Sequence, residues 1–147
     1  MAAGISWQGM DALQLRLFEA HLNALKALGG ALNLEGETIM TKSKKIVPVD
    51  DGYLMNSGFV EQPEYSGHEV SVTLGYGGKA AAYALAVHEV GSPGFPGTPN
   101  HPWYGKSADD INWNRPGSGS KYLEKPVKEA QRNLHRRLAR RIKRRIL

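Results

Sequence analysis

Residues 46–57, Ile-Val-Pro-Val-Asp-Asp-Gly-Tyr-Leu-Met-Asn-Ser, mark a change of pattern in this chain of 147 residues. Before this stretch, apolar residues recur at every third or fourth position, which is typical of an amphipathic helix. After it, from Phe59 onward, apolar and polar residues alternate, which is typical of half-buried strands. Pro48 ends the helical part, because the residue before a proline is disfavoured in the helical conformation. The length suits one domain, so we expect a single α+β domain over residues 1–147.

The helical pattern covers about residues 8–46. One face carries apolar residues at helical spacing from Met10 to Leu28. Gly29 and Gly30 interrupt this face, and each glycine inside a helix costs about 1 kcal/mol relative to alanine. Two interpretations therefore remain open: one long helix that is broken at the glycines, or two helices that are joined there.

The alternating part predicts a small antiparallel sheet. Phe59–Glu61 and Val70–Leu74 fit two strands, and Pro63–Gly67 fits the hairpin connection between them. The alanine-rich run 80–90 fits either a short helix or a third strand, because periodicity does not separate the two over so short a length. We expect residues 58–90 to be mainly strands.

Residues 91–120 contain six glycines and five prolines, which predicts an extended loop. The loop also carries the aromatic residues Trp103, Tyr104 and Trp113. Aromatic side chains are enriched at the centres of protein interfaces, so we interpret these three as candidate contacts with a neighbouring subunit. The alternative is an insertion without ordered structure.

The C-terminal residues 123–147 predict a helix with a strongly basic surface. Residues 130–147 hold 8 Lys+Arg and no acid, a net of +8, whereas residues 1–129 hold 11 Lys+Arg and 14 Asp+Glu, a net of −3. Apolar residues at i, i+4 spacing from Ala130 to Ile146 form a core-facing row. The cations are candidate contacts with DNA or with an acidic partner; they are Arg132, Arg136, Arg137, Arg140, Arg141, Lys143, Arg144 and Arg145. A solvated charged face is the alternative, and a membrane-surface helix is disfavoured because the apolar row is narrow and lacks aromatics.

The sequence carries no recognisable catalytic or cofactor motif. It contains no cysteine, which excludes disulfides, thiolate metal sites and a cysteine nucleophile. His88-Glu89 with His101 and Asp109-Asp110 lacks the ligand spacing of a known metal site. We therefore expect no enzyme, no metal and no cofactor. No apolar run reaches the length of a membrane span and the N-terminus lacks signal-peptide features, so we expect no membrane partner.

Three segments, in their order along residues 40–130, resemble the neck proteins of tailed bacteriophages, the minor tail or tail-completion family encoded among the head–tail joining genes. The first is residues 46–57, with its Val-Pro-Val-Asp core. The second is residues 82–91, with Tyr-Ala followed by Glu-x-Gly, and the third is residues 121–127, which open the last helix. The residues that carry the resemblance are Pro48, Asp50, Gly52, Leu54, Ser57, Tyr83, Glu89, Gly91, Leu123 and Pro126. Four residues depart from the family's usual threonine, arginine, phenylalanine and alanine; they are Asp51, Tyr53, Tyr122 and Val127.

The resemblance implies an α+β subunit in which a small antiparallel sheet is packed by a long helix. It implies a structural role without catalysis: a ring homo-oligomer, hexamer favoured and dodecamer second, that joins the DNA-filled head to the tail. Adjacent neck and tail proteins would be its partners, with DNA in the channel as a further candidate. The protein would act in the virion neck after assembly in the host cytoplasm. The alternative function is a small intracellular nucleic-acid-binding protein that acts through its basic C-terminal helix.

Overall fold

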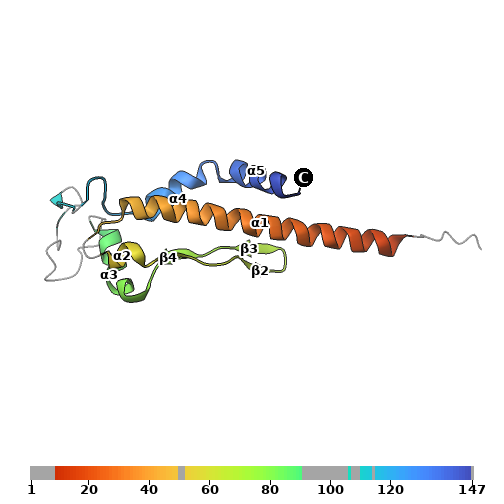
Figure 1. Ribbon diagram of the computed structural model, residues 1–147, viewed down its shortest axis with the longest axis horizontal. Helices are drawn as coiled ribbons and strands as arrows, with labels where there is room; N and C mark the ends of the chain where they lie inside the picture. Colours follow the sequence, from red (N-terminus) through yellow and green to blue (C-terminus); the bar gives the residue numbers. More distant parts are fainter. Residues whose placement is uncertain (1–8, 50–51, 91–105, 107–109, 114, 147) are drawn as a thin grey trace, which may run out of the picture.

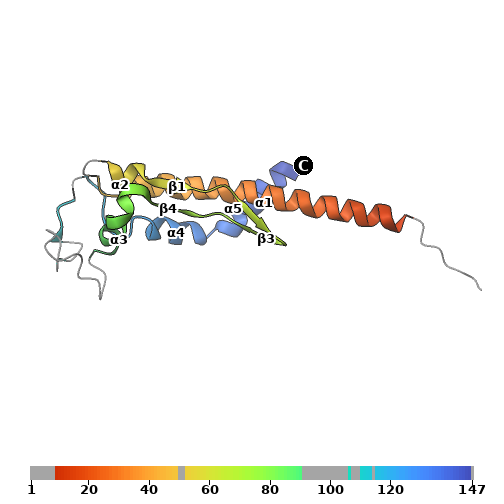
Figure 2. The same ribbon diagram turned by 90° about the horizontal axis from the view of Figure 1, so that it is seen from below.

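The computed structural model describes residues 9–49, 52–90, 106, 110–113 and 115–146. A single helix, α1 (Met10–Ile46), runs along the long axis of the molecule, as Figure 1 shows. Helices α4 (Glu124–Gln131) and α5 (Leu134–Ile146) run along one side of α1, and the strands run along the opposite side (Figures 1 and 2). The predicted α+β fold is confirmed: the chain has a long N-terminal helix, small antiparallel strand pairs and a basic C-terminal helical segment.

Helix α1 is continuous through Gly29 and Gly30, so the predicted break or joint at the glycines is wrong. The two glycines instead let other elements come close to the helix. A Cβ at Gly29 would meet the Tyr65 side chain on the strand side, and a Cβ at Gly30 would meet the Arg145 guanidinium on the α5 side. Helix α1 is therefore continuous here despite the poor helix propensity of glycine.

The C-terminal end of α1 lies where Pro48 requires it, at Ile46. The last carbonyls of the helix are satisfied by the end of the Gly/Pro-rich segment. The Arg115 guanidinium donates to the carbonyls of Lys44, at 2.8 Å, and of Lys45, and the Gly119 N–H donates to Ile46 at 3.0 Å. This part of the segment is therefore a cap for α1 rather than a loop without contacts.

The strands form one long antiparallel hairpin, residues 58–76, which we call the hairpin. Strand β1 (Gly58–Val60) pairs with β4 (Leu74–Tyr76), and β2 (Glu64–Ser66) pairs with β3 (Glu69–Ser71). The Glu61 N–H donates to the Thr73 carbonyl at 2.8 Å and continues the ladder between the two pairs. The expected hairpin is confirmed, but its turn is at Gly67 and His68, because Glu64–Ser66 belong to a strand.

The hairpin packs one face on α1. Tyr65 lies over Gly29, and a Cβ at Gly36 would lie 3.0 Å from Val60 Cγ1 and 3.4 Å from Val72 Cγ1. Near the turn, His68 Nδ1 lies 3.1 Å from Nε2 of His21 on α1. Successive strand residues point to opposite faces, so the residues between these contacts face away from the helix.

Residues 78–89 are helical, so the expectation that residues 58–90 are mainly strands is wrong for this part. After the short α2 (Tyr53–Asn56) and the hairpin come the 3-10 turn η1 (Gly78–Ala80) and α3 (Ala81–Glu89). Alanine has the highest helix propensity of all residues. Ala80, Ala84 and Val87 recur at helical spacing and are buried together, which resolves the open choice in favour of a helix.

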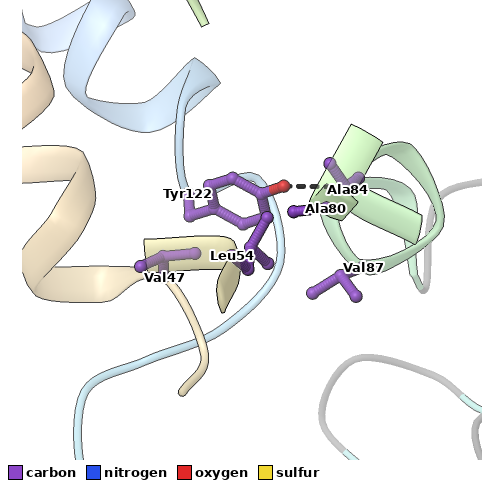
Figure 3. Packing of buried hydrophobic residues seen from close by; sticks show 6 residues of the cluster. All are labelled: Val47, Leu54, Ala80, Ala84, Val87 and Tyr122. Atoms are coloured by element: carbon purple, nitrogen blue, oxygen red, sulfur yellow. Dashed lines mark hydrogen bonds between the residues drawn. The ribbon is translucent and has the colours of Figure 1, made fainter. Parts of the chain in front are cut away.

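The hydrophobic core lies at the C-terminal end of α1, where distant segments meet (Figure 3). Val47, Leu54 and Tyr122 pack with the buried face of η1 and α3. The Tyr122 hydroxyl points at α3 and donates to the Ala84 carbonyl at 2.7 Å. Burial, joined by nearby Tyr76, raises the pKa of the Tyr122 phenol well above its usual value.

The C-terminal segment is two helices rather than the single helix expected over 123–147. Helix α4 ends at Gln131, and α5 begins at Leu134. The carbonyl of Ala130, freed from the helical ladder at this break, accepts bonds from the Asn133 N–H at 3.3 Å and from Nη2 of Arg137 at 2.9 Å. Arg137 therefore stabilises the break between the two helices.

Candidate functional site

The residues that carry the family resemblance assemble the core rather than a pocket. Leu54 and Pro126 are buried, and the Ser57 hydroxyl donates to the Leu54 carbonyl at 2.8 Å. Gly52 precedes α2 with a φ of 83°, a conformation that favours glycine. Leu123 packs partly buried against the same core cluster. Their arrangement indicates a structural purpose for the three segments.

Pro48, which belongs to the same set, is also buried, whereas two other members of the set are not. Tyr83 is exposed, and Glu89 is half-buried at the end of α3. Asp50 and Gly91 lie outside the described residues.

One cluster of metal-ligand side chains exists among the described residues, formed by His88, Glu89 and Glu124. Lys121 already holds it together: its ammonium binds Glu89 and lies 3.3 Å from Glu124 Oε2. His88 Nδ1 lies 2.7 Å from Glu89 Oε1. The hydrogen bond with Glu89 raises the pKa of Lys121. Because the Lys121 ammonium binds two of the three candidate ligands, the contacts of this cluster are those of an ion-pair network. Of the other candidates considered with His88, His101 and Asp109 lie outside the described residues, and Asp110 is exposed.

The aromatic candidates for a subunit interface divide in the structure. Trp103 and Tyr104 lie outside the described residues. Trp113 is partly buried against the core cluster of its own chain. Trp113 therefore has an intramolecular packing role.

The dominant electrostatic feature is a buried carboxylate that binds two arginines of α5. Glu35 lies in the middle of α1 and its side chain is only 3% exposed. Its Oε2 accepts a hydrogen bond from Nε of Arg137 at 2.8 Å, and its Oε1 accepts one from Nε of Arg141 at 2.8 Å. The two arginines are one helical turn apart, so one carboxylate binds both. We call this arrangement the Glu35 clamp.

The clamp is held in its charged state. Burial raises the pKa of Glu35, but the hydrogen bonds and charges of Arg137 and Arg141 more than offset this, so the pKa lies below the ordinary 4.5. Removal of one partner would leave a poorly compensated charge next to the core. The clamp therefore fixes both the position and the rotation of α5 on α1.

The eight predicted contact cations fall into three groups in the structure. Arg137 and Arg141 bind Glu35 within the chain, so these two already have a carboxylate partner. The Arg145 guanidinium lies against Gly30 of α1. Arg132, Arg136, Arg140, Lys143 and Arg144 are exposed. Within the part of the chain that the structure describes, no carboxylate forms an ion pair with any of these five.

Sequence analysis missed Glu35, although a signal was present. Ala31, Glu35 and Ile39 occur at i, i+4 and i+8 of α1, and all three are buried. An acid in the middle of an apolar helix face needs a cationic partner, because charges are rarely buried without one. The acid-free basic segment at the C-terminus is the place to look for that partner.

The N-terminal part of α1 extends beyond the rest of the described structure (Figures 1 and 2). Its large apolar side chains are uncovered: Leu13, Leu17 and Phe18 are between 52% and 63% exposed. Contiguous exposed apolar surface of this kind marks interaction sites in soluble proteins.

The described helices contain no segment that is both long and apolar enough to span a membrane. Comparison with protein-family models, with curated proteins and with solved structures finds no match to this chain.

Proposed function

We propose that this chain is a structural subunit of a tailed-phage virion, a ring-forming neck or tail-completion component that joins the DNA-filled head to the tail. One observation carries the proposal: the subunit leaves three different surfaces uncovered around a single long helix. These surfaces are the apolar N-terminal part of α1, the cations of α5 and the outer face of the hairpin. The resemblance of residues 46–57, 82–91 and 121–127 to phage neck proteins supports the same assignment.

A ring subunit needs two unlike surfaces, because neighbours in a ring contact each other through different patches. The fold supports this role by fixing its elements around α1. The core cluster at Tyr122 holds the C-terminal end of α1, and the Glu35 clamp holds α5. The described residues form a packed frame with exposed patches, and this arrangement suits assembly better than catalysis.

The test is electron microscopy, with native mass spectrometry, of tailed particles produced by the genome that encodes the chain. We expect several copies in a closed ring between head and tail. The proposal is overturned if the chain is absent from the particles or is present as a single copy. The molecular mass of the isolated protein in solution does not replace this test, because a subunit that is monomeric in solution can still assemble into a ring on the particle.

A second candidate function is binding of nucleic acid through α5. The exposed residues Arg136, Arg140, Lys143 and Arg144 favour it, since clustered cations bind phosphates without reading bases. This candidate predicts that the isolated protein binds duplex DNA with an affinity that falls steeply as salt rises. Binding that is equally weak at low and high salt would exclude it.

A further inference from the structure

We propose that the exposed cations of α5 bind the acidic outer face of the hairpin of a second copy of this chain, in a head-to-tail contact. This inference rests on the proposed ring function and names the contact between neighbouring subunits. It assigns a protein partner to the cations, which the sequence alone left open between DNA and an acidic surface.

The cationic side of the contact is set by the Glu35 clamp. With Arg137 and Arg141 bound to Glu35 of α1, the side chains of Arg136, Arg140, Lys143 and Arg144 fall within about 100° of arc on α5. This arc begins next to Arg137 and lies opposite the apolar row of Leu134, Leu138 and Ile142. We call these four the cationic face. All four are exposed, and none forms an ion pair within the described part of the chain.

The acidic side of the contact is set by strand alternation. Tyr65 and Val72 point to α1, so Glu64, Ser66, Glu69 and Ser71 lie on the opposite face of the hairpin, which we call the acidic face. Glu64 is paired with Ser71, and Glu69 with Ser66, in the strand register. Glu64 and Glu69 are exposed, and among the described residues neither has a cationic partner.

Helix α5 and the hairpin, which carry the two faces, lie on opposite sides of α1 (Figure 1), so the two faces do not meet within one chain. Between two chains, a contact of one face with the other leaves a free cationic face at one end and a free acidic face at the other. Such a contact repeats and closes into a ring when the rotation permits it.

A second copy fits better than the other occupants. A symmetric contact of α5 with α5 would bring cations against cations, and a contact of hairpin with hairpin would bring Glu64 and Glu69 against the same residues. DNA would neutralise the cationic face but leave the acidic face without a partner. The head-to-tail contact compensates both faces at once.

The absence of cysteine makes disulfide trapping a clean test. Ser66→Cys places one thiol on the acidic face, and Ala139→Cys places one thiol one turn before Lys143 at the edge of the cationic face; both positions are exposed. In full-length protein with both substitutions, oxidised at low salt, we expect a ladder of disulfide-linked multimers. Mixing the two single-cysteine proteins should give Ser66→Cys with Ala139→Cys heterodimers. Homodimers through Ala139→Cys alone, or no cross-linked species, would overturn the proposal.

Charge reversal supplies the matched control. Arg140→Glu with Arg144→Glu, or Glu64→Lys with Glu69→Lys, should each reduce the cross-linked ladder about tenfold, since like charges then face each other. The variant that carries all four substitutions should restore the ladder, because the charges are exchanged between the two faces. An unchanged yield of cross-linked multimers after either charge reversal, or no recovery of that yield in the fourfold variant, would contradict the proposal. All four positions are exposed, so we expect each variant to be about as stable as the wild type. The urea midpoint of each variant checks this.

DNA binding and particle analysis separate the remaining outcomes. If the cations bind DNA instead, Arg140→Glu with Arg144→Glu abolishes DNA binding. The further addition of Glu64→Lys and Glu69→Lys then restores no ladder of cross-linked multimers, and this inference is overturned. If the chain forms a ring in particles but gives no cross-link, this inference fails and the proposed function stands. If the chain is absent from particles, the proposed function fails whatever the cross-linking shows.

Discussion

The Nε of Arg137 donates a 2.8 Å hydrogen bond to the buried carboxylate of Glu35, which lies 102 residues earlier in the chain. Arg141 binds the other oxygen of the same carboxylate. This contact joins α1 to α5 and determines which cations of α5 face α1. The exposed cationic face is therefore a consequence of one acid in α1.

Glu35→Gln should destabilise the protein and release α5 from α1. The amide carries no charge, so Arg137 and Arg141 lose their partner next to the core, at a cost of about 2 to 3 kcal/mol. Urea unfolding measures the loss, and hydrogen exchange should locate the opening in α5. Glu129→Gln, which removes the exposed pair with Lys42, is the control and should leave both readouts unchanged. Equal effects of the two substitutions would contradict a special role for the clamp.

The clamp should also fail in acid. The pKa of Glu35 is lower in the folded protein than its ordinary 4.5, so below that pH the unfolded chain binds more protons than the folded one. The contribution of the clamp is thus complete above pH 4.5 and is lost as pH falls through the folded pKa. Urea midpoints of the wild type and of Glu35→Gln should differ at neutral pH and converge in strong acid. A difference that persists at the lowest pH would show that charge is not the cause.

Tyr122→Phe should cost about 1 kcal/mol, because it removes the bond from the buried hydroxyl to the Ala84 carbonyl and keeps the ring packing. The matched control is Tyr65→Phe, since Tyr65 is exposed on the hairpin and should tolerate the change. Chemical denaturation compares the two. An effect of Tyr65→Phe as large as that of Tyr122→Phe would count against the core assignment.

Two glycines of α1 should respond differently to alanine. At Gly30 the new methyl group meets only the far end of the Arg145 side chain, which moves aside, so the gain in helix propensity of about 1 kcal/mol is kept. At Gly36 the methyl group meets Val60 and Val72 of the hairpin, which are packed on the helix and yield less. Gly30→Ala should therefore raise the melting temperature more than Gly36→Ala does. The reverse order would show that the hairpin is loosely packed.

Much of the fold could be predicted from the sequence because local signals agree with it. Pro48 ends α1 at the expected place, and alternation from Phe59 gives the hairpin. The failures have a common cause: they depend on contacts between distant segments. Gly29 and Gly30 look like a break until Tyr65 and Arg145 approach them from two sides. The alanine-rich run at 80–90 is ambiguous until Tyr122 packs on it.

The candidate site was predicted only in part for the same reason. The basic character of α5 is evident from the sequence, but its division into inward and outward cations depends on Glu35, which is far away along the chain. Likewise, the acidic face of the hairpin depends on which strand face packs on α1, and this is fixed by contacts such as Tyr65 with Gly29. The sequence identifies the charged residues of α5 and of the hairpin, and the fold determines which of them face away from α1.

The measurement that tests the central claim most directly is a reconstruction of the tailed particle made by the genome that encodes this chain. We predict a closed ring of several copies between head and tail, with the core cluster at Tyr122 and the Glu35 clamp intact in each copy. Particles whose head–tail junction contains no copy of the chain, or only one, would contradict the account.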